Sequence, residues 1–276
     1  MSPENVRFNA RVLLVEDSPI SQIVAKEALT FFGLDVDLVG NGQEAVEKIS
    51  RTRYDLVFMD CQMPIMDGYK ASAEIRRNEE QRQAKRVPIV ALTALSSFKE
   101  RRQIFESGVD DYIAKPFQMN ELFTCLMKWL KEQIELRSSR AVAKKEENAP
   151  EAEKIKEGSC LDESILKRVL DLEAMMPSGG LLKELFQTYV ASSQDVMQQM
   201  DKDVSFKCFE GIRQKAHSLK SSSSHVGAIT LSNLFGELES AALDRDADKT
   251  ASFFSRIRKE YHTVLSEIKR RLKEYA

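Results

Sequence analysis

Short apolar runs alternate with amphipathic stretches along the first part of the chain, from residue 11 to about residue 117. Because these runs are apolar at nearly every position, they predict strands buried on both faces, at 11–17, 35–40, 54–60, 87–94 and 110–116. The stretches between and after them have helical periodicity, at 18–32, 43–51, 69–77, 97–106 and 120–136, with Gly33 and Gly108 placed as helix stops. This alternation predicts a doubly wound α/β domain of the flavodoxin-like (βα)5 type.

The pattern changes after this domain. Residues 137–158 are mostly serine, lysine, glutamate and alanine, which predicts a linker, although its beginning could instead extend the fifth helix. Beyond residue 159, apolar residues recur at spacings of three and four, which predicts an all-α antiparallel helical bundle with helices at 162–172, 179–200, 205–224, 229–243 and 248–273. We therefore expect a first domain at 1–136 with a core at about 10–132, the linker at 137–158, and a second domain at 159–276.

The composition narrows the functional classes. Lysine plus arginine (41) nearly balances aspartate plus glutamate (43), and no basic helix carries interleaved aromatic residues, so nucleic acid is not an expected partner. No run approaches the roughly 18 apolar residues that cross a bilayer, so we expect no membrane span. The four cysteines have no metal-ligand spacing, which is typical of reduced cytosolic thiols. We expect a cytoplasmic protein.

Polar residues gather at the carboxyl ends of four predicted strands. Glu16 and Asp17 end the first strand, Asp60 ends the third, Thr93 lies near the end of the fourth, and Lys115 ends the fifth. In an open parallel sheet this edge is where ligands bind. Three carboxylates held close together repel one another unless a cation lies among them, and oxygen ligands favour a hard ion. The sequence therefore predicts an Mg2+ site here, with Lys115 as a second positive charge.

These residues lie in stretches that resemble the response regulator receiver domain, namely VLLVEDSPISQ, YDLVFMDCQMPIMDGYK, PIVALTA and DYIAKPF. The resemblance implies that Asp60 accepts a phosphoryl group from a phosphohistidine. It also implies a metal site made of Glu16, Asp17, Asp60 and the backbone carbonyl of Gln62. Lys115 would pair with the acyl phosphate.

The same resemblance makes Thr93 and Tyr112 a switch pair: the hydroxyl of Thr93 moves toward the new phosphoryl oxygens, and Tyr112 turns inward. It also suggests that Gln62 and Leu95 flank the phosphoryl group, and that the Lys115–Pro116 bond is similar to the family's cis peptide. Cys61, next to the phosphoacceptor, is expected to be a buried cysteine that packs as a small hydrophobe.

One histidine stands out in the second half. The apolar residues of its segment form a stripe of Phe209, Ile212, Ala216 and Leu219. His217 lies about 120° from the centre of that stripe at 100° per residue, so we expect its imidazole to face solvent. Ser221 and Ser224 are small enough to let a partner surface approach the ring, and Lys220 can help to neutralise a phosphoryl group.

This segment resembles the histidine-containing phosphotransfer (HPt) domain, whose signature is His-x-Leu-Lys-Gly-Ser followed by a glycine. His217, Leu219, Lys220 and Gly227 match it, and Ser221 departs from the usual glycine. The resemblance implies that His217 carries a phosphoryl group. His225 and His262 lack this context and are expected to be structural or solvated, and helix packing is the expected reason for the serine run 221–224.

Together these features predict a two-component phosphorelay protein. A histidine kinase would donate phosphate to Asp60, and His217 would exchange phosphate with a receiver aspartate of this chain or of another. Without a P-loop or a glycine-rich nucleotide box, the chain is not expected to be an enzyme that uses ATP. Two alternatives stay open: a C-terminal fragment of a hybrid histidine kinase, and a receiver-gated protein-binding adaptor in which His217 carries no phosphate.

Overall fold

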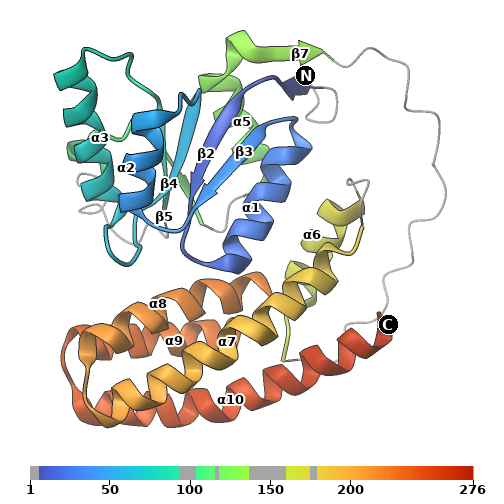
Figure 1. The fold of residues 1–276 in the computed structure, drawn as a ribbon. Coiled ribbons are helices and arrows are strands. Elements are labelled where there is room, and N and C mark those ends of the chain that lie inside the picture. The colour runs from blue at the N-terminus through green and yellow to red at the C-terminus, as the bar shows by residue number, and fades with distance from the viewer. Residues whose placement is uncertain (1–5, 94–103, 116–117, 137–159, 175–178, 276) are drawn as a thin grey trace.

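The computed structural model describes residues 6–93, 104–115, 118–136, 160–174 and 179–275. Its first domain is built on a parallel sheet in the order β3-β2-β4-β5-β6 (Figure 1). The strands are β2 (Arg11–Val15), β3 (Asp35–Val39), β4 (Leu56–Asp60), β5 (Ile89–Thr93) and β6 (Asp111–Ala114). This order is that of flavodoxin-like folds, and the predicted fold class is confirmed.

Helices cover both faces of this sheet. They are α1 (Pro19–Phe31), α2 (Gly42–Arg51), α3 (Gly68–Arg82) and α5 (Met119–Trp129). The first three begin after the side-chain caps Ser18, Asn41 and Asp67, each of which accepts a bond from a backbone N–H of the first turn. One apolar cluster lies under α1 and α5, and a second lies under α2 and α3. Of the helix predicted at 97–106, only residues 104–106 are described, and they are helical.

The end of the first domain differs from the prediction. The helix predicted to reach residue 136 ends at Trp129, and a 3-10 turn at Lys131–Gln133 leads into a strand, β7 (Ile134–Leu136). This strand pairs antiparallel with an unpredicted N-terminal strand, β1 (Val6–Phe8). Both strands have only three residues, too few for periodicity to reveal, and tertiary burial holds β1, since Val6 and Phe8 are each 1% exposed. The predicted linker, 137–158, lies outside the described residues.

The second domain is helical, as predicted. Its helices are α6 (Glu163–Ala174), α7 (Leu181–Ser205), α8 (Phe209–His225), α9 (Ile229–Leu243) and α10 (Ala247–Glu274). The last four form an antiparallel bundle, with α6 packed against α7. The turn between α8 and α9 needs a glycine: Gly227 has φ +81°, and its carbonyl accepts a bond from the N–H of Asp162.

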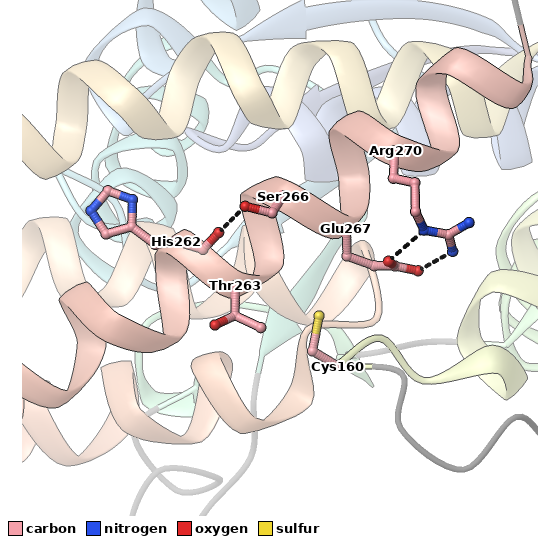
Figure 2. Close-up of a pocket in the computed structure, with 6 residues that line it drawn as sticks. All are labelled: Cys160, His262, Thr263, Ser266, Glu267 and Arg270. Atoms are coloured by element: carbon pink, nitrogen blue, oxygen red, sulfur yellow. Dashed lines mark hydrogen bonds and ion pairs between the residues drawn. The ribbon is translucent and has the colours of Figure 1, made fainter.

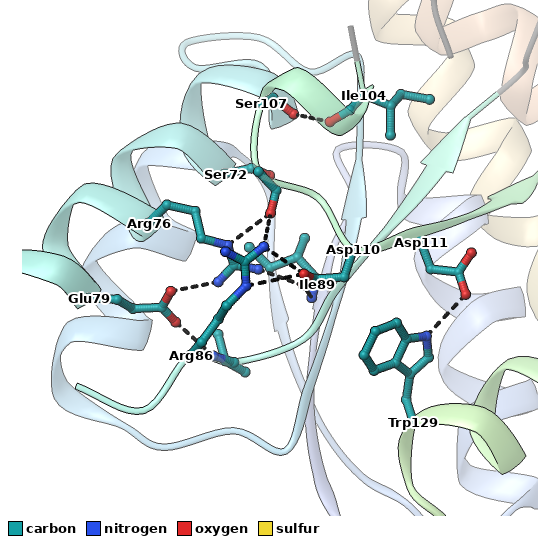
Figure 3. Close-up of polar contacts among 12 residues, drawn as sticks. Ser72, Arg76, Glu79, Arg86, Ile89, Ile104, Ser107, Asp110, Asp111 and Trp129 are labelled. Atoms are coloured by element: carbon teal, nitrogen blue, oxygen red, sulfur yellow. Dashed lines mark hydrogen bonds and ion pairs between the residues drawn. The ribbon is translucent and has the colours of Figure 1, made fainter. Parts of the chain in front are cut away.

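A charge network braces the amino-terminal end of the sheet, opposite the predicted pocket (Figure 3). Arg76 on α3 donates to the carbonyl of Gly108 and pairs with Asp110 at 2.7 Å, while Asp110 also accepts from the N–H of Ile89. Glu79 pairs with Arg76 and accepts from the N–H of Val87. These partly buried charges therefore tie α3 to the beginnings of β5 and β6.

The two domains are in contact. Helix α1 of the first lies across α7 and α8 of the second (Figure 1). Ile20 belongs to the apolar cluster of the bundle, and Ile23 and Val24 pack against it. Within the described ranges, no helix is both long enough and apolar enough to cross a membrane.

Candidate phosphotransfer site

The predicted carboxylates converge at the carboxyl end of the sheet. Glu16 and Asp17 follow β2, and Asp60 is the last residue of the adjacent β4. Each offers a carboxylate oxygen, and these oxygens lie within 4.8 Å of one another. Glu16 is 1% exposed and Asp60 is 5% exposed, so the cluster is largely closed to water.

Lys115 joins this cluster from the end of β6. Its Nζ lies 2.7 Å from Oδ2 of Asp60 and also donates to Oε2 of Glu16. Burial opposes a charged amine, but the charges of Asp60 and Glu16 outweigh it and hold the pKa of Lys115 above its ordinary value. One ammonium therefore contacts two of the three carboxylates but balances only one negative charge.

The remaining negative charge is costly. Burial is the largest cause that raises the pKa of Glu16 to about 8, and the charge of Asp60 adds to it against the opposing effect of Lys115. Burial and the charge of Asp60 also raise the pKa of Asp17 to about 6. A close set of oxygen donors with excess negative charge fits a hard divalent cation, and these three residues would hold it.

The other predicted residues of the first domain surround this cluster. The backbone N–H of Gln62 donates to Oδ1 of Asp60 at 3.1 Å, which fixes the chain just after Asp60. Thr93 ends β5 and is 6% exposed. Tyr112, on the neighbouring β6, packs edge-on against Phe105 with ring centroids 6.1 Å apart. Their switching and ligand roles stay predictions, and Leu95 and Pro116 lie outside the described residues.

The loop after Asp60 accounts for the properties of two residues, Cys61 and Gly68. Cys61 is 2% exposed, and burial raises the pKa of its thiol to about 12, as expected of a small apolar packing residue. Gly68 begins α3 against the backbone of Asp60, where an added Cβ would lie 2.0 Å from the carbonyl oxygen of Asp60. A side chain at position 68 would displace Asp60.

His217 does not face open solvent, and that expectation is corrected. Its side chain is 19% exposed, because Glu239 of α9 lies beside it, with Oε1 2.9 Å from the imidazole Nδ1, and the first domain lies against α8. The charge of His217 reaches Asp17, whose pKa it lowers against the larger effects of burial and Asp60. The imidazole therefore lies off the apolar stripe of α8, as predicted, but on the side of the carboxylate cluster.

Glu239 was not predicted, and it organises the histidine. Burial favours its neutral form, but the hydrogen bond and charge of His217 and the charge of Lys220 hold the pKa of Glu239 below its ordinary value. Lys220 reaches its Oε2 at 3.3 Å. A carboxylate at Nδ1 favours the tautomer with the proton on Nδ1, which leaves the nucleophilic lone pair on Nε2.

The two other histidines differ from each other. His225 lies near the end of α8, bonded through Nδ1 to the carbonyl of Ser221, and burial is the main cause that lowers its pKa to about 4, with a smaller contribution from the charge of Lys115. His225 is thus structural, as one of the two expected readings had it. His262 is exposed and lines a surface cavity on α10 with Cys160 and Glu267 (Figure 2). That cavity includes none of the predicted site residues.

Comparisons with known proteins agree with this arrangement. Residues 12–127 match the response regulator receiver domain, and residues 184–267 match the Hpt domain. The chain therefore joins a receiver domain to an Hpt domain, two modules of two-component phosphorelays.

Similar proteins include long sensor kinases. Sensor protein GacS of Pseudomonas syringae pv. syringae is 40% identical over 43% of this chain and 13% of its own length. Aerobic respiration control sensor protein ArcB of Escherichia coli is 27% identical over 94% of this chain, which includes both domains, and 31% of its own length. A crystal structure of a sensor kinase receiver domain from Pseudomonas aeruginosa, with magnesium in its active-site cleft, is 43% identical over 44% of this chain and 98% of that chain, with a TM-score of 0.41. The chain thus corresponds to a small part of the full-length relatives.

Proposed function

We propose that this chain is a phosphorelay intermediate in which Asp60 accepts a phosphoryl group from a histidine kinase and His217 exchanges phosphate with a receiver aspartate. The observation that carries the proposal is the placement of His217. A single fold brings an imidazole, oriented by Glu239, to the side of the carboxylate cluster that contains Asp60.

The exchange needs no group beyond these two residues and the cations around them. In one direction, Nε2 of His217 attacks the phosphorus of the Asp60 acyl phosphate, the P–O bond to Asp60 breaks, and the carboxylate is restored. In the other direction, a carboxylate oxygen of Asp60 attacks a phosphohistidine and the P–N bond breaks. Lys115, at 2.7 Å from Oδ2, stabilises the negative charge that develops on this side. Glu239 stabilises the imidazolium as it forms.

We propose Mg2+ as the cation of the cluster, held by Glu16, Asp17, Asp60 and the carbonyl of Gln62. When bound, it would neutralise charge on the phosphoryl oxygens. The raised pKa values of Glu16 and Asp17 support this, since an added cation would relieve the same repulsion. Mg2+ should therefore raise the unfolding temperature of the wild type at pH 7.5 and leave an Asp17→Asn variant nearly unchanged.

The partners and location follow from the same proposal. An upstream histidine kinase supplies phosphate to Asp60, and the Hpt domain serves a receiver domain. Four cysteines that are free within the described residues support a cytoplasmic protein. The greater length of the relatives is compatible with a fragment of a hybrid kinase, in which both domains would carry out the same exchange.

Radiolabel transfer tests the proposal. The full chain is treated with labelled acetyl phosphate and Mg2+ and compared with Asp60→Asn and His217→Gln. The wild type should carry label in a base-labile acyl phosphate and in an acid-labile, base-stable phosphohistidine. Asp60→Asn should carry neither, and His217→Gln should carry the first alone. Label on Asp60 with none on His217 in the wild type would instead favour the adaptor alternative.

A further inference from the structure

Two pairs of serine hydroxyls join the receiver and Hpt domains. Ser18, the cap of α1, lies 3.0 Å from Ser222 of α8 between the two Oγ atoms. One turn further along α1, the Oγ of Ser21 lies 3.1 Å from the Oγ of Ser221 on α8. Ser18 is 0% exposed and Ser222 is 5% exposed, so water does not compete for the first pair. These are side-chain contacts between residues about 200 positions apart in the sequence.

The hydrogens of the buried pair have one consistent arrangement. The hydroxyl of Ser222 donates to the carbonyl of Ser218 at 2.9 Å, so it can only accept from Ser18. Ser18 in turn accepts from the N–H of Ser21 at 3.4 Å. A chain of donors therefore runs from the first turn of α1 into the backbone of α8. Replacing either hydroxyl by an apolar group leaves a buried polar atom without its partner.

The second pair involves the position where the Hpt signature is not matched. Ser221 stands where the signature has glycine, and it lies one helical turn after His217, on the same face of α8. The structure assigns its hydroxyl a partner, Ser21, on the chain's own receiver. Ile20 and Val24 of α1 pack against the bundle beside these pairs, and the second pair is partly buried.

We infer that these serine pairs select the chain's own receiver as the partner of His217, and that the docked receiver keeps other receivers away from that histidine. This rests on the proposed function, because it assumes that His217 exchanges phosphate. A receiver without hydroxyls at the positions of Ser18 and Ser21 would leave the hydroxyl of Ser221 without its partner, and Ser222 would keep only its bond to the carbonyl of Ser218. Transfer to a separate receiver therefore requires α1 to leave α8 first.

A double-mutant cycle on the full chain tests the selection. Ser21→Ala, Ser221→Ala and the double variant are labelled with acetyl phosphate at high dilution, and movement of label from Asp60 to His217 is timed. Each single variant should slow internal transfer by about 3- to 10-fold, the effect of one lost hydrogen bond. The double variant should be no slower than either single variant, since the same bond is lost.

Ser205→Ala is the matched control. It removes an exposed hydroxyl of the same domain, which donates to the carbonyl of Asp201 within its own helix at 2.8 Å. It should transfer at the wild-type rate. Independent, multiplicative effects of Ser21→Ala and Ser221→Ala, or no effect of either, would overturn the inference.

In phosphate transfer between two chains, the same substitution should have the opposite effect on the rate. Phosphorylated His217→Gln chains, which keep Ser21, donate label to acceptor chains that carry Asp60→Asn. Adding Ser21→Ala to the acceptor should speed transfer between chains, because its own receiver docks less tightly and exposes His217. A structural defect would slow this reaction as well, and that result would refute the occlusion. If His217 never takes up label in wild type, the proposed function itself has failed.

Discussion

The two residues proposed to carry phosphate, Asp60 and His217, lie in contrasting surroundings. Asp60 is buried at the carboxyl end of β4, with two further carboxylates and a bridging lysine. His217 lies on the surface of a helix bundle, 19% exposed, with one carboxylate and one lysine nearby. Among the described residues, the Hpt side has no cluster of metal-binding groups. The charges that could stabilise a transferring phosphoryl group therefore belong almost entirely to the receiver.

This contrast shows how the work is divided. A buried charged cluster is expensive to build, since each uncompensated carboxylate opposes folding. Placing it in one domain leaves the other free to be a rigid helical support that presents and orients one ring.

The largest expected effect comes from removing the positive charge of Lys115 from the receiver. Lys115→Met leaves Glu16 and Asp60 without their shared cation, and we expect it to lower the free energy of unfolding by about 3 kcal/mol at pH 7 without divalent ions. Urea unfolding measures this. Lys128→Met is the control, because its ion pair with Asp111 is exposed and should be worth at most about 1 kcal/mol. Equal losses of unfolding free energy in Lys115→Met and Lys128→Met would show that the buried cluster depends on its lysine no more than an exposed ion pair does.

The next test asks whether the signature glycine of the Hpt domain is a folding residue. In Gly227→Ala, the left-handed φ of +81° and a Cβ 3.1 Å from the carbonyl of Asp162 both oppose the side chain. We expect a loss of about 2 kcal/mol in the free energy of unfolding. Gly180→Ala has the same φ and meets nothing within 4 Å, so it should lose only about 1 kcal/mol. Transfer to His217 in the folded variants should be unchanged; a slower transfer would make Gly227 part of the site.

A pH series tests the burial of His225 at the end of α8. The pKa of His225 is about 4 in the folded chain and 6.5 ordinarily, so the folded state disfavours its protonation. The contribution of His225 to the free energy of unfolding should therefore fall as pH drops below 6.5, by about 2 kcal/mol at pH 5, and level off below pH 4. The raised pKa values of Glu16 and Asp17 act in the opposite direction, so the quantity to compare is the difference between wild type and His225→Gln. Chemical unfolding at several pH values measures this, and His225→Gln should lose this part of the pH dependence. A His262→Gln control, at an exposed position, should keep it.

The smallest expected effect concerns Glu239. Glu239→Gln can still hydrogen-bond to Nδ1 of His217 but cannot stabilise its positive charge, whereas Glu239→Ala does neither. We expect internal transfer to slow about 5-fold in the first variant and more in the second. Quenched-flow labelling gives these rates. Equal rates in Glu239→Ala and wild type would show that His217 is oriented by the bundle alone.

Most of the receiver could be predicted because its information is local. Each buried strand ends in the residue that reaches the pocket, so strand periodicity placed Asp17, Asp60 and Lys115 at one edge. The Hpt helices were likewise evident from apolar spacing. The antiparallel pair β1 and β7 was missed because three-residue strands have no period, and tertiary pairing overrides the helical propensity of residues 134–136.

Glu239 and the serine pairs depend on tertiary contacts. Glu239 is 22 positions from His217 on the next helix, and no spacing rule connects them. The serine run 221–224 was interpreted as helix packing, which holds for Ser223, bonded to Tyr189. For Ser221 and Ser222 the contact is with another domain. Only a fold that places α1 against α8 could show this.

The pairing of β1 with β7 has a mechanical consequence. Val6 lies opposite Leu136, so the chain that enters the receiver and the chain that leaves it are held at the same point. If these two ends were pulled apart, the residue pairs between β1 and β7 would separate one at a time, starting with Val6 and Leu136. The five-stranded sheet would bear the force last. Each residue released from β7 would add about 3.3 Å to the tether between the domains. The buried side chains of Val6 and Phe8 thus hold β7 in place and limit how far the receiver can move from His217.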